Sequence, residues 1–332
     1  MKSTHTLAYI GCALVLSACG GGGGGGTGST PVQTSSLSTI AAADASKAAE
    51  NAFSTSSLVS QSSSWLSGIL TGVSVTPAST GVVSPVLALV KGAYRRDDGN
   101  LLTGVSKSSA CEGGGTFSVD ATLSDQSKLS NGDALTITLN NCVVQGSTEN
   151  GTLSIKVSAV SGDILSSTGT ATLDVLFNNF SVAAGSGATN LSGDMKISVN
   201  DTGSNNSSLA ISGASLLTSV QISGATVASR ALSSYSVTSS AQGTTLTSAA
   251  NFSLSGKSNG LGQFAYTVKN LQPLVSNGTD LPTSGALIVN GAASSVVMTV
   301  VPNGVRVDHS DNGNGIVTKS STLSWGDLFA NF

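Results

Sequence analysis

Few side chains in this 332-residue sequence are suited to catalysis. It has 2 histidines, of which His5 lies at the N-terminus and His309 near the C-terminus. A Ser-His-Asp site needs a histidine as its base, and no Ser-x-x-Lys pair offers a replacement. Glutamate is also scarce, with Glu50, Glu112 and Glu149 its three occurrences. We therefore predict no catalytic residues, no cofactor and no enzymatic activity.

Three pairs of aspartates have the spacing of paired carboxylates, the arrangement that glycosidases use as acid and base. Each pair lies beside turn residues, where aspartate is common because its side chain bonds to nearby backbone. The turn interpretation is therefore preferred. The pairs are Asp97 with Asp98, Asp120 with Asp125, and Asp308 with Asp311.

One stretch resembles half of a calcium-binding loop. In DHSDNGNG, residues 308–315, Asp308, Ser310 and Asn312 occupy alternate ligand positions before Gly313. A complete loop needs a bidentate glutamate at its twelfth position, where this sequence has Lys319. A polar hairpin tip is the preferred interpretation, and the calcium loop is kept as the single candidate metal site.

The N-terminus has the pattern of an exported protein. Lys2 precedes an apolar run over residues 7–16, which is followed by small residues, as in a secretory signal peptide. The tetrapeptide Leu16-Ser17-Ala18-Cys19 resembles a bacterial lipobox. That resemblance implies a signal peptide over residues 1–18 and a lipidated, acylated Cys19 that anchors the chain to a membrane. The alternative is an ordinary signal peptide with an incidental cysteine.

The residues after Cys19 refine the expected location. Residue 20 is glycine rather than aspartate, which in Gram-negative lipoproteins implies the outer membrane. Residues 19–36 are mostly Gly, Ser, Thr and Pro, a composition typical of a flexible tether. We predict a lipid-anchored envelope protein that stands away from the bilayer.

Two cysteines remain in the exported chain, Cys111 and Cys142. A single pair in an oxidising compartment predicts a disulfide. The alternative is a metal or redox pair, which the absence of a Cys-x-x-Cys spacing disfavours.

The composition excludes several classes of partner. Charged residues make up 9% of the chain and the net charge is −3, so there is no basic surface for nucleic acid. Aromatic residues make up 4%, too few for stacking platforms or a sugar-binding cleft. The low share of charged residues is compensated by serine, threonine, asparagine and glycine. Such a polar but uncharged composition is typical of an extracytoplasmic β protein.

Two further regions follow the tether. Residues 37–98 are rich in alanine, the best helix former, and predict two or three helices, with Ser38 as a possible cap. An amphipathic region lying on the membrane is the alternative. From Gly115 onward, segments such as ALTITLNNCVV and SSVVMTVV alternate apolar and polar side chains, as strands do. Residues 99–332 are assigned to this second region. We predict an antiparallel β domain of about a dozen strands.

Asn-Gly pairs are the strongest short signals for β-hairpin turns. We expect turns at Asn131-Gly132, Asn150-Gly151, Asn259-Gly260, Asn277-Gly278, Asn303-Gly304 and Asn312-Gly313. A loose internal repeat accompanies them. LTITLNNCVV before GTLSIKV resembles LDVLFNNFSV before GDMKISV, with a looser copy at YTVKNLQPLV. We interpret this similarity as hairpins that share turn chemistry.

The predicted fold is α+β and mainly β. It is a long antiparallel meander, either a twisted sheet or a partly closed barrel, covered by the Ala-rich helices. The body resembles β-rich proteobacterial outer-membrane lipoproteins, a resemblance that implies no activity. Three functions remain: a non-enzymatic structural or binding role, a LolA-like or LolB-like carrier of lipid or other apolar ligands, and a surface adhesin. The expected partners are the membrane and either an envelope protein or an apolar ligand.

Overall fold

The computed structural model describes residues 36–59, 105–111, 113–125, 128–144, 146–162, 168–203, 206–278 and 281–329. All of them belong to one compact unit, Thr34–Phe332. The predicted signal peptide, Cys19, the tether up to residue 35 and the predicted helical residues 60–98 lie outside the described residues.

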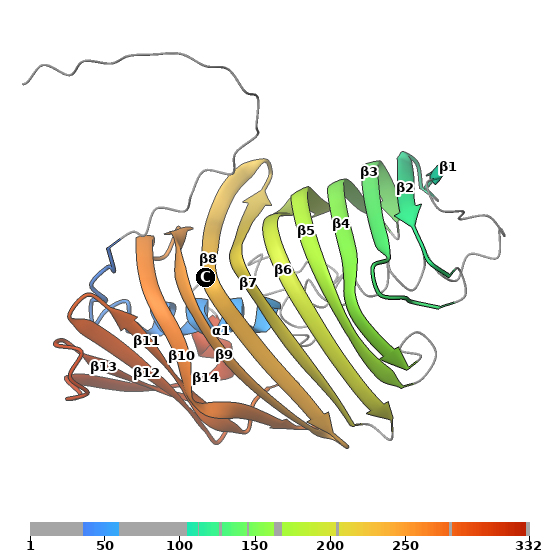
Figure 1. Ribbon diagram of the computed structural model, residues 1–332. Helices are drawn as coiled ribbons and strands as arrows, with labels where there is room; N and C mark the ends of the chain where they lie inside the picture. The colour runs from blue at the N-terminus through green and yellow to red at the C-terminus, as the bar shows by residue number, and fades with distance from the viewer. Residues whose placement is uncertain are drawn as a thin grey trace, which may run out of the picture. The chain divides into compact units, whose positions relative to one another are not determined.

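The fold is a single antiparallel sheet whose strands lie side by side in chain order, from β1 at one edge to β14 at the other. Because β1 and β14 are not paired, the sheet is not closed into a barrel. The predicted mainly-β antiparallel meander is confirmed (Figure 1). The strands are β1 (Val105–Ala110), β2 (Thr116–Thr122), β3 (Ala134–Val144), β4 (Ser147–Gly162), β5 (Gly169–Ala184), β6 (Gly187–Gly203), β7 (Asn206–Ile222), β8 (Ala225–Gln242), β9 (Thr245–Ser258), β10 (Gly262–Asn277), β11 (Ser284–Gly291), β12 (Ser294–Val301), β13 (Gly304–Ser310) and β14 (Lys319–Ser324).

The two faces of the sheet differ. Alternate side chains along the strands are buried and apolar, and we call the face that carries them the inner face. The helix α1 (Ala45–Val59) contacts β11, β12 and β13, as well as the short helix α4 (Trp325–Phe329). The rings of Phe53 and Trp325 lie 5.3 Å apart at this contact. The opposite face carries mainly Ser, Thr and Asn, and we call it the outward face.

Ser38 is not the helix cap that the sequence suggested. The helix begins at Ala45, and the Ala48 N–H donates to the Asp44 carbonyl at 2.9 Å in its first turn. Ser38 instead pairs with β10, because its N–H donates to the Ala265 carbonyl at 2.8 Å. The edge of β10 beyond its pairing with β11 is therefore occupied by the segment that leads into α1.

The predicted disulfide is confirmed. Cys111, just after β1, is bonded to Cys142 in β3, with their Cα atoms 5.4 Å apart. Both side chains are buried in the core. The bond joins the β1 edge of the sheet to β3 across β2.

The sheet has a regular part and a bent part. Every strand pair from β3·β4 to β10·β11 contains a shift of register, whereas the pairs β1·β2, β2·β3, β11·β12, β12·β13 and β13·β14 contain none. An extra residue in one strand bends it and increases its twist. Figure 1 shows β7 and β8 bending in this way.

Bulge chemistry, rather than turn chemistry, explains the internal repeat. Asn141 and Asn179 both have positive φ, 47° and 48°, within strands β3 and β5. A glycine on the adjacent strand makes room for the bulge of β5, because a Cβ on Gly151 would lie 2.2 Å from the Asn179 carbonyl oxygen. The predicted turn at Asn150-Gly151 is therefore wrong, since both residues lie inside β4.

Polar side chains satisfy backbone groups that the bulges leave outside the regular ladder. The Asp194 carboxylate accepts from the backbone N–H groups of Ala214 and Ser215, both at 2.8 Å. The Tyr235 hydroxyl donates to the Asp194 carbonyl. Burial, with the nearby Asp194 charge, raises the pKa of Tyr235. These groups hold the bend of β7 in place.

Candidate functional site

The candidate calcium ligands are engaged with other protein groups. The Asp308 carboxylate accepts from Arg306 Nε at 2.8 Å and from the Ser320 hydroxyl at 2.6 Å. Ser310 Oγ donates to Asn314 Oδ1 at 3.3 Å, and Asn312 is exposed. Within the described residues, no three His, Cys, Asp or Glu side chains gather as a metal site. The calcium loop stays a prediction without a structural contact that favours it.

His309 is buried and holds the chain that leads into α1. Its Nε2 donates to the Ile40 carbonyl at 2.8 Å. Its Nδ1 lies 3.3 Å from the Thr318 hydroxyl and 3.5 Å from Asp311. With only 1% of its surface exposed, this imidazole positions backbone and does not face an open site.

The paired carboxylates do not form a common site in the described chain. Asp125 lies 3.8 Å from Lys128, while Asp308 and Asp311 contact Arg306 and His309 respectively. Asp120 is exposed on β2. The pair Asp97 and Asp98 lies outside the described residues.

The sequence also contains Gly256-x-Ser258-x-Gly260, the spacing of a nucleophile elbow, which was not among the predicted sites. An elbow places its serine on a turn from a strand to a helix. Here Ser258 ends β9 and precedes the turn to β10, and its hydroxyl accepts from the Leu261 N–H at 3.3 Å. The antiparallel hairpin excludes the elbow geometry.

A cluster of polar side chains is buried between α1 and β8. Glu50, Asn51 and Arg230 are exposed by 0%, 1% and 2%. Arg230 Nε donates to Asn51 Oδ1 at 2.6 Å. Among the described residues, neither carboxylate oxygen of Glu50 has a hydrogen-bond partner. We call these three residues the buried polar cluster.

Burial shifts both ionisable groups of this cluster toward neutrality. Desolvation raises the pKa of Glu50 to about 8, although the positive charge of Arg230 opposes the shift. Desolvation also lowers the pKa of Arg230 to about 10, against the effect of Glu50. A perturbed carboxyl group can mark an active site when it lies in a cleft. Arg230 lines the smaller hollow described below, whereas Glu50 and Asn51 line neither hollow. We interpret the cluster as a contact that fixes α1 on β8, because Arg230 Nε donates to Asn51 Oδ1.

Among the described residues, two hollows lie on the outward face. The larger is lined by uncharged residues, and the smaller by uncharged residues and Arg230. The larger has a volume of about 500 Å³ and crosses β5 to β10. The smaller has a volume of about 260 Å³ and crosses β6 to β9. The exposed leucine Leu217 lies at the smaller one. The larger hollow is the best candidate for a functional surface, and we call it the trough.

The trough lies between two ranks of side chains that run across the strands. One rank is Thr170, Asn200, Ser208, Ser240 and Thr247; the other is Thr172, Ser198, Ala210, Thr238 and Ala249. Pro273 of β10 closes one end. The residues between the ranks direct their side chains to the inner face, so backbone forms the floor. The trough lies at the end of the sheet where β6 and β8 finish. The ends of these two strands are seen in the lower part of Figure 1.

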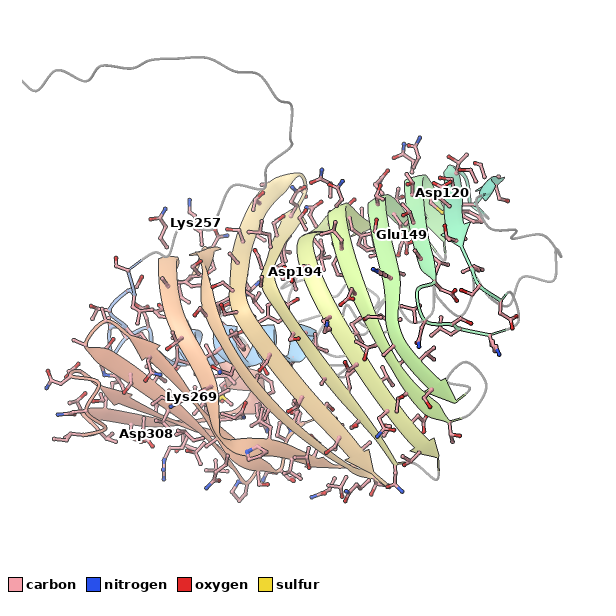
Figure 2. The ribbon with its side chains drawn as sticks, viewed as in Figure 1. Asp120, Glu149, Asp194, Lys257, Lys269 and Asp308 are labelled. Atoms are coloured by element: carbon pink, nitrogen blue, oxygen red, sulfur yellow. A yellow bond between two sulfur atoms is a disulfide. The ribbon has the colours of Figure 1, made fainter. Side chains whose placement is uncertain are left out.

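The arrangement of the trough is suited to binding and unsuited to proton transfer. None of its lining residues is ionisable. Lys257 lies near the other end of β9, and Figure 2 places it at the upper edge of the sheet. Hydroxyl groups both donate and accept hydrogen bonds, so the two ranks can bond to a neutral polar ligand.

Comparison of the chain with protein-family models, with curated proteins and with solved structures gave no match. Among the described helices, none is long and apolar enough to cross a membrane.

Proposed function

We propose that this protein is a membrane-anchored, extracytoplasmic lipoprotein with a non-enzymatic binding role. The trough is the observation that carries the binding role. It is a concave, uncharged hollow of about 500 Å³ on the outward face of the sheet, and its walls contain no acid, base or nucleophile pair.

The proposed location rests on the lipobox at Cys19 and is supported by the disulfide. Structural disulfides persist in oxidising compartments and are rare in the cytosol. The bond between Cys111 and Cys142 is buried, as a structural cross-link should be. The outer membrane follows from Gly20, in the position where aspartate directs retention at the inner membrane.

Metabolic labelling tests the anchor. Cells expressing the full chain are given labelled palmitate, with Cys19→Ser as the variant and Cys12→Ser as the matched control. We expect label in the wild type and in Cys12→Ser, and none in Cys19→Ser. Incorporation of equal label into Cys19→Ser would refute lipidation at this residue.

A surface adhesin is the second candidate, and the breadth of the polar outward face favours it. Brief protease treatment of intact cells, followed by detection of the full-length chain, distinguishes a protein on the cell surface from one that faces the periplasm. Loss of the full-length protein from intact cells indicates surface exposure, and protection until the outer membrane is permeabilised indicates a periplasmic orientation. The carrier of apolar ligands stays a prediction, because residues 60–98, most of the helical segment predicted to cover the sheet, lie outside the described residues.

A further inference from the structure

The lining of the trough is uncharged, and the neighbouring side chains show that this neutrality is local. The next rank of side chains along the same face contains Lys156, Asp174 and Lys196, with Lys196 Nζ 3.5 Å from the Asp174 carboxylate. The two ranks of the trough contain no charge at all. An anionic or cationic ligand would therefore be desolvated there without a partner, which costs free energy.

The polar groups of the trough are available to a ligand. Eight of the ten rank residues carry a hydroxyl or amide group. The side-chain hydrogen bond between described rank residues joins Thr172 to Ser198 at 3.1 Å. The backbone groups of the floor belong to the sheet ladder. A ligand here must therefore bond to side-chain hydroxyls, and must carry many donors and acceptors of its own.

The dimensions of the trough suit an extended polymer. It crosses six strands, so its length is about 24 Å at a strand spacing of ~4.8 Å. The two ranks are two residues apart along each strand, or about 7 Å. Nearly every strand that the trough crosses presents a polar side chain to it. The spacing between neighbouring strands is close to the length of one sugar ring in a linear glycan.

We infer that the trough binds a linear, uncharged glycan that lies across the strands of β5 to β10. A peptide fits less well, because an extended peptide pairs its backbone with a sheet edge and the floor offers no free backbone groups. The low aromatic content argued against both stacking platforms and a sugar-binding cleft, and a glycan in the trough overturns the second expectation. Here rows of hydroxyls replace such platforms. Without stacking on aromatic rings, each sugar contributes little binding free energy. The affinity should therefore rise with the number of sugars bound.

The inference rests on the proposed binding role and does not depend on the lipid anchor. Detergent-solubilised full-length protein is titrated with cellohexaose, chitohexaose and mannohexaose, and with polygalacturonate as an anionic counterpart. The shorter trisaccharides of each neutral series are included. We expect at least one neutral hexamer to bind, more tightly than its trimer and with no dependence on salt, because no ion pairs form.

Two variants on one strand locate the site. Thr238→Leu places an apolar side chain in the wall of the trough, and Ser236→Leu places the same side chain on the adjacent rank, outside it. Both positions are exposed on β8. We expect Thr238→Leu to weaken hexamer binding about tenfold or more, and Ser236→Leu to leave it unchanged. Equal unfolding midpoints for the two variants would exclude a loss of fold.

Other outcomes overturn the inference in distinguishable ways. Binding of polygalacturonate alone, or failure of every neutral hexamer, refutes the neutral-glycan site. If wild-type protein instead captures an envelope protein and Thr238→Leu does not, the binding role stands and the glycan inference fails. If the trough variants change no interaction at all, the proposed binding role itself fails, whatever the palmitate label shows.

Discussion

The buried polar cluster and the trough use polar side chains for opposite purposes. In the cluster, Arg230 and Asn51 are removed from water and depend on each other. In the trough, Thr238 and its neighbours keep their contact with solvent. A buried polar group without a partner costs free energy, whereas an exposed one has water as its alternative partner. Substitutions in the cluster should therefore change stability, and substitutions in the trough should change binding.

The largest expected effect is the loss of the guanidinium from the cluster. Arg230→Ala leaves Asn51 Oδ1 without its donor and Glu50 without its neighbouring positive charge. Removing one member of a buried charged pair typically costs about 3–5 kcal/mol. Urea unfolding should show this loss, while Lys257→Ala, an exposed site on the neighbouring strand, should change stability by less than about 0.5 kcal/mol. Equal stabilities would contradict the cluster's role.

The second prediction concerns pH. The Glu50 pKa is about 8 in the folded protein against 4.5 in the unfolded chain, so the folded state binds the additional proton between these values. Stability should fall as pH rises from 4.5 to 8, by at most about 1.4 kcal/mol per pH unit. Below pH 4.5 and above pH 8, the ionisation of Glu50 should no longer change the stability.

Glu50→Gln tests this slope because its amide cannot ionise. The variant should lack the Glu50 contribution and become increasingly more stable than the wild type between pH 4.5 and 8. The matched control is Glu149→Gln in β4, at a carboxyl group whose pKa burial raises but which is partly exposed. If thermal melts show the same slope for wild type and Glu50→Gln, the carboxyl does not stay protonated in the core.

A smaller loss is expected in the bent part of the sheet. Gly151→Ala introduces a Cβ that would lie 2.2 Å from the Asn179 carbonyl oxygen, at a position with φ of +102°. Strain of this kind costs about 1–3 kcal/mol. Gly146→Ala is the control, because that glycine also has a positive φ, 81°, yet its Cβ would meet nothing within 4 Å. Chemical denaturation should rank Gly151→Ala as clearly less stable than Gly146→Ala.

The smallest stability effect is expected in the trough. Thr238→Ala removes an exposed hydroxyl and methyl group, and stability should change by less than about 0.5 kcal/mol. Its effect on glycan binding should nevertheless be measurable by calorimetry. A large loss of stability in Thr238→Ala, without a change in binding, would remove the distinction between the two polar regions.

The sequence predicted the strands well because half-buried strands impose a period of two. β3 and β12 were anticipated as ALTITLNNCVV and SSVVMTVV and have those bounds. β1 was missed because VSKSSA contains little apolar alternation. The disulfide could be predicted because the N-terminal pattern assigned Cys12 to a signal peptide and Cys19 to a lipid anchor, which left Cys111 and Cys142 as the expected pair.

The bulges were missed although the sequence contains a signal for them. Phe177 and Phe180 both point to the inner face, and so do Leu232 and Tyr235. Two core residues three positions apart cannot share a face of a regular strand. An extra residue between them is therefore required, and an asparagine or serine with positive φ supplies it in each case.

Contacts between distant residues could not be predicted in the same way. Ser38 had the type and position of a helix cap, but the free edge of β10 offered a stronger backbone partner. Asn51 and Arg230 are 179 residues apart, and nothing local in either segment indicates the pairing. The same holds for the trough, whose ranks draw one residue from each of several strands.

Local pattern thus determined which segments form strands, where most turns lie and which cysteines pair, because period-two burial, Asn-Gly backbone preferences and cysteine number are properties of the chain itself. The tertiary structure decided the register between strands, the bends that the bulges introduce and the contact between the buried side chains of Arg230 and Asn51. Register depends on how neighbouring strands pack, and it alone aligns isolated hydroxyl side chains into the two ranks of the trough.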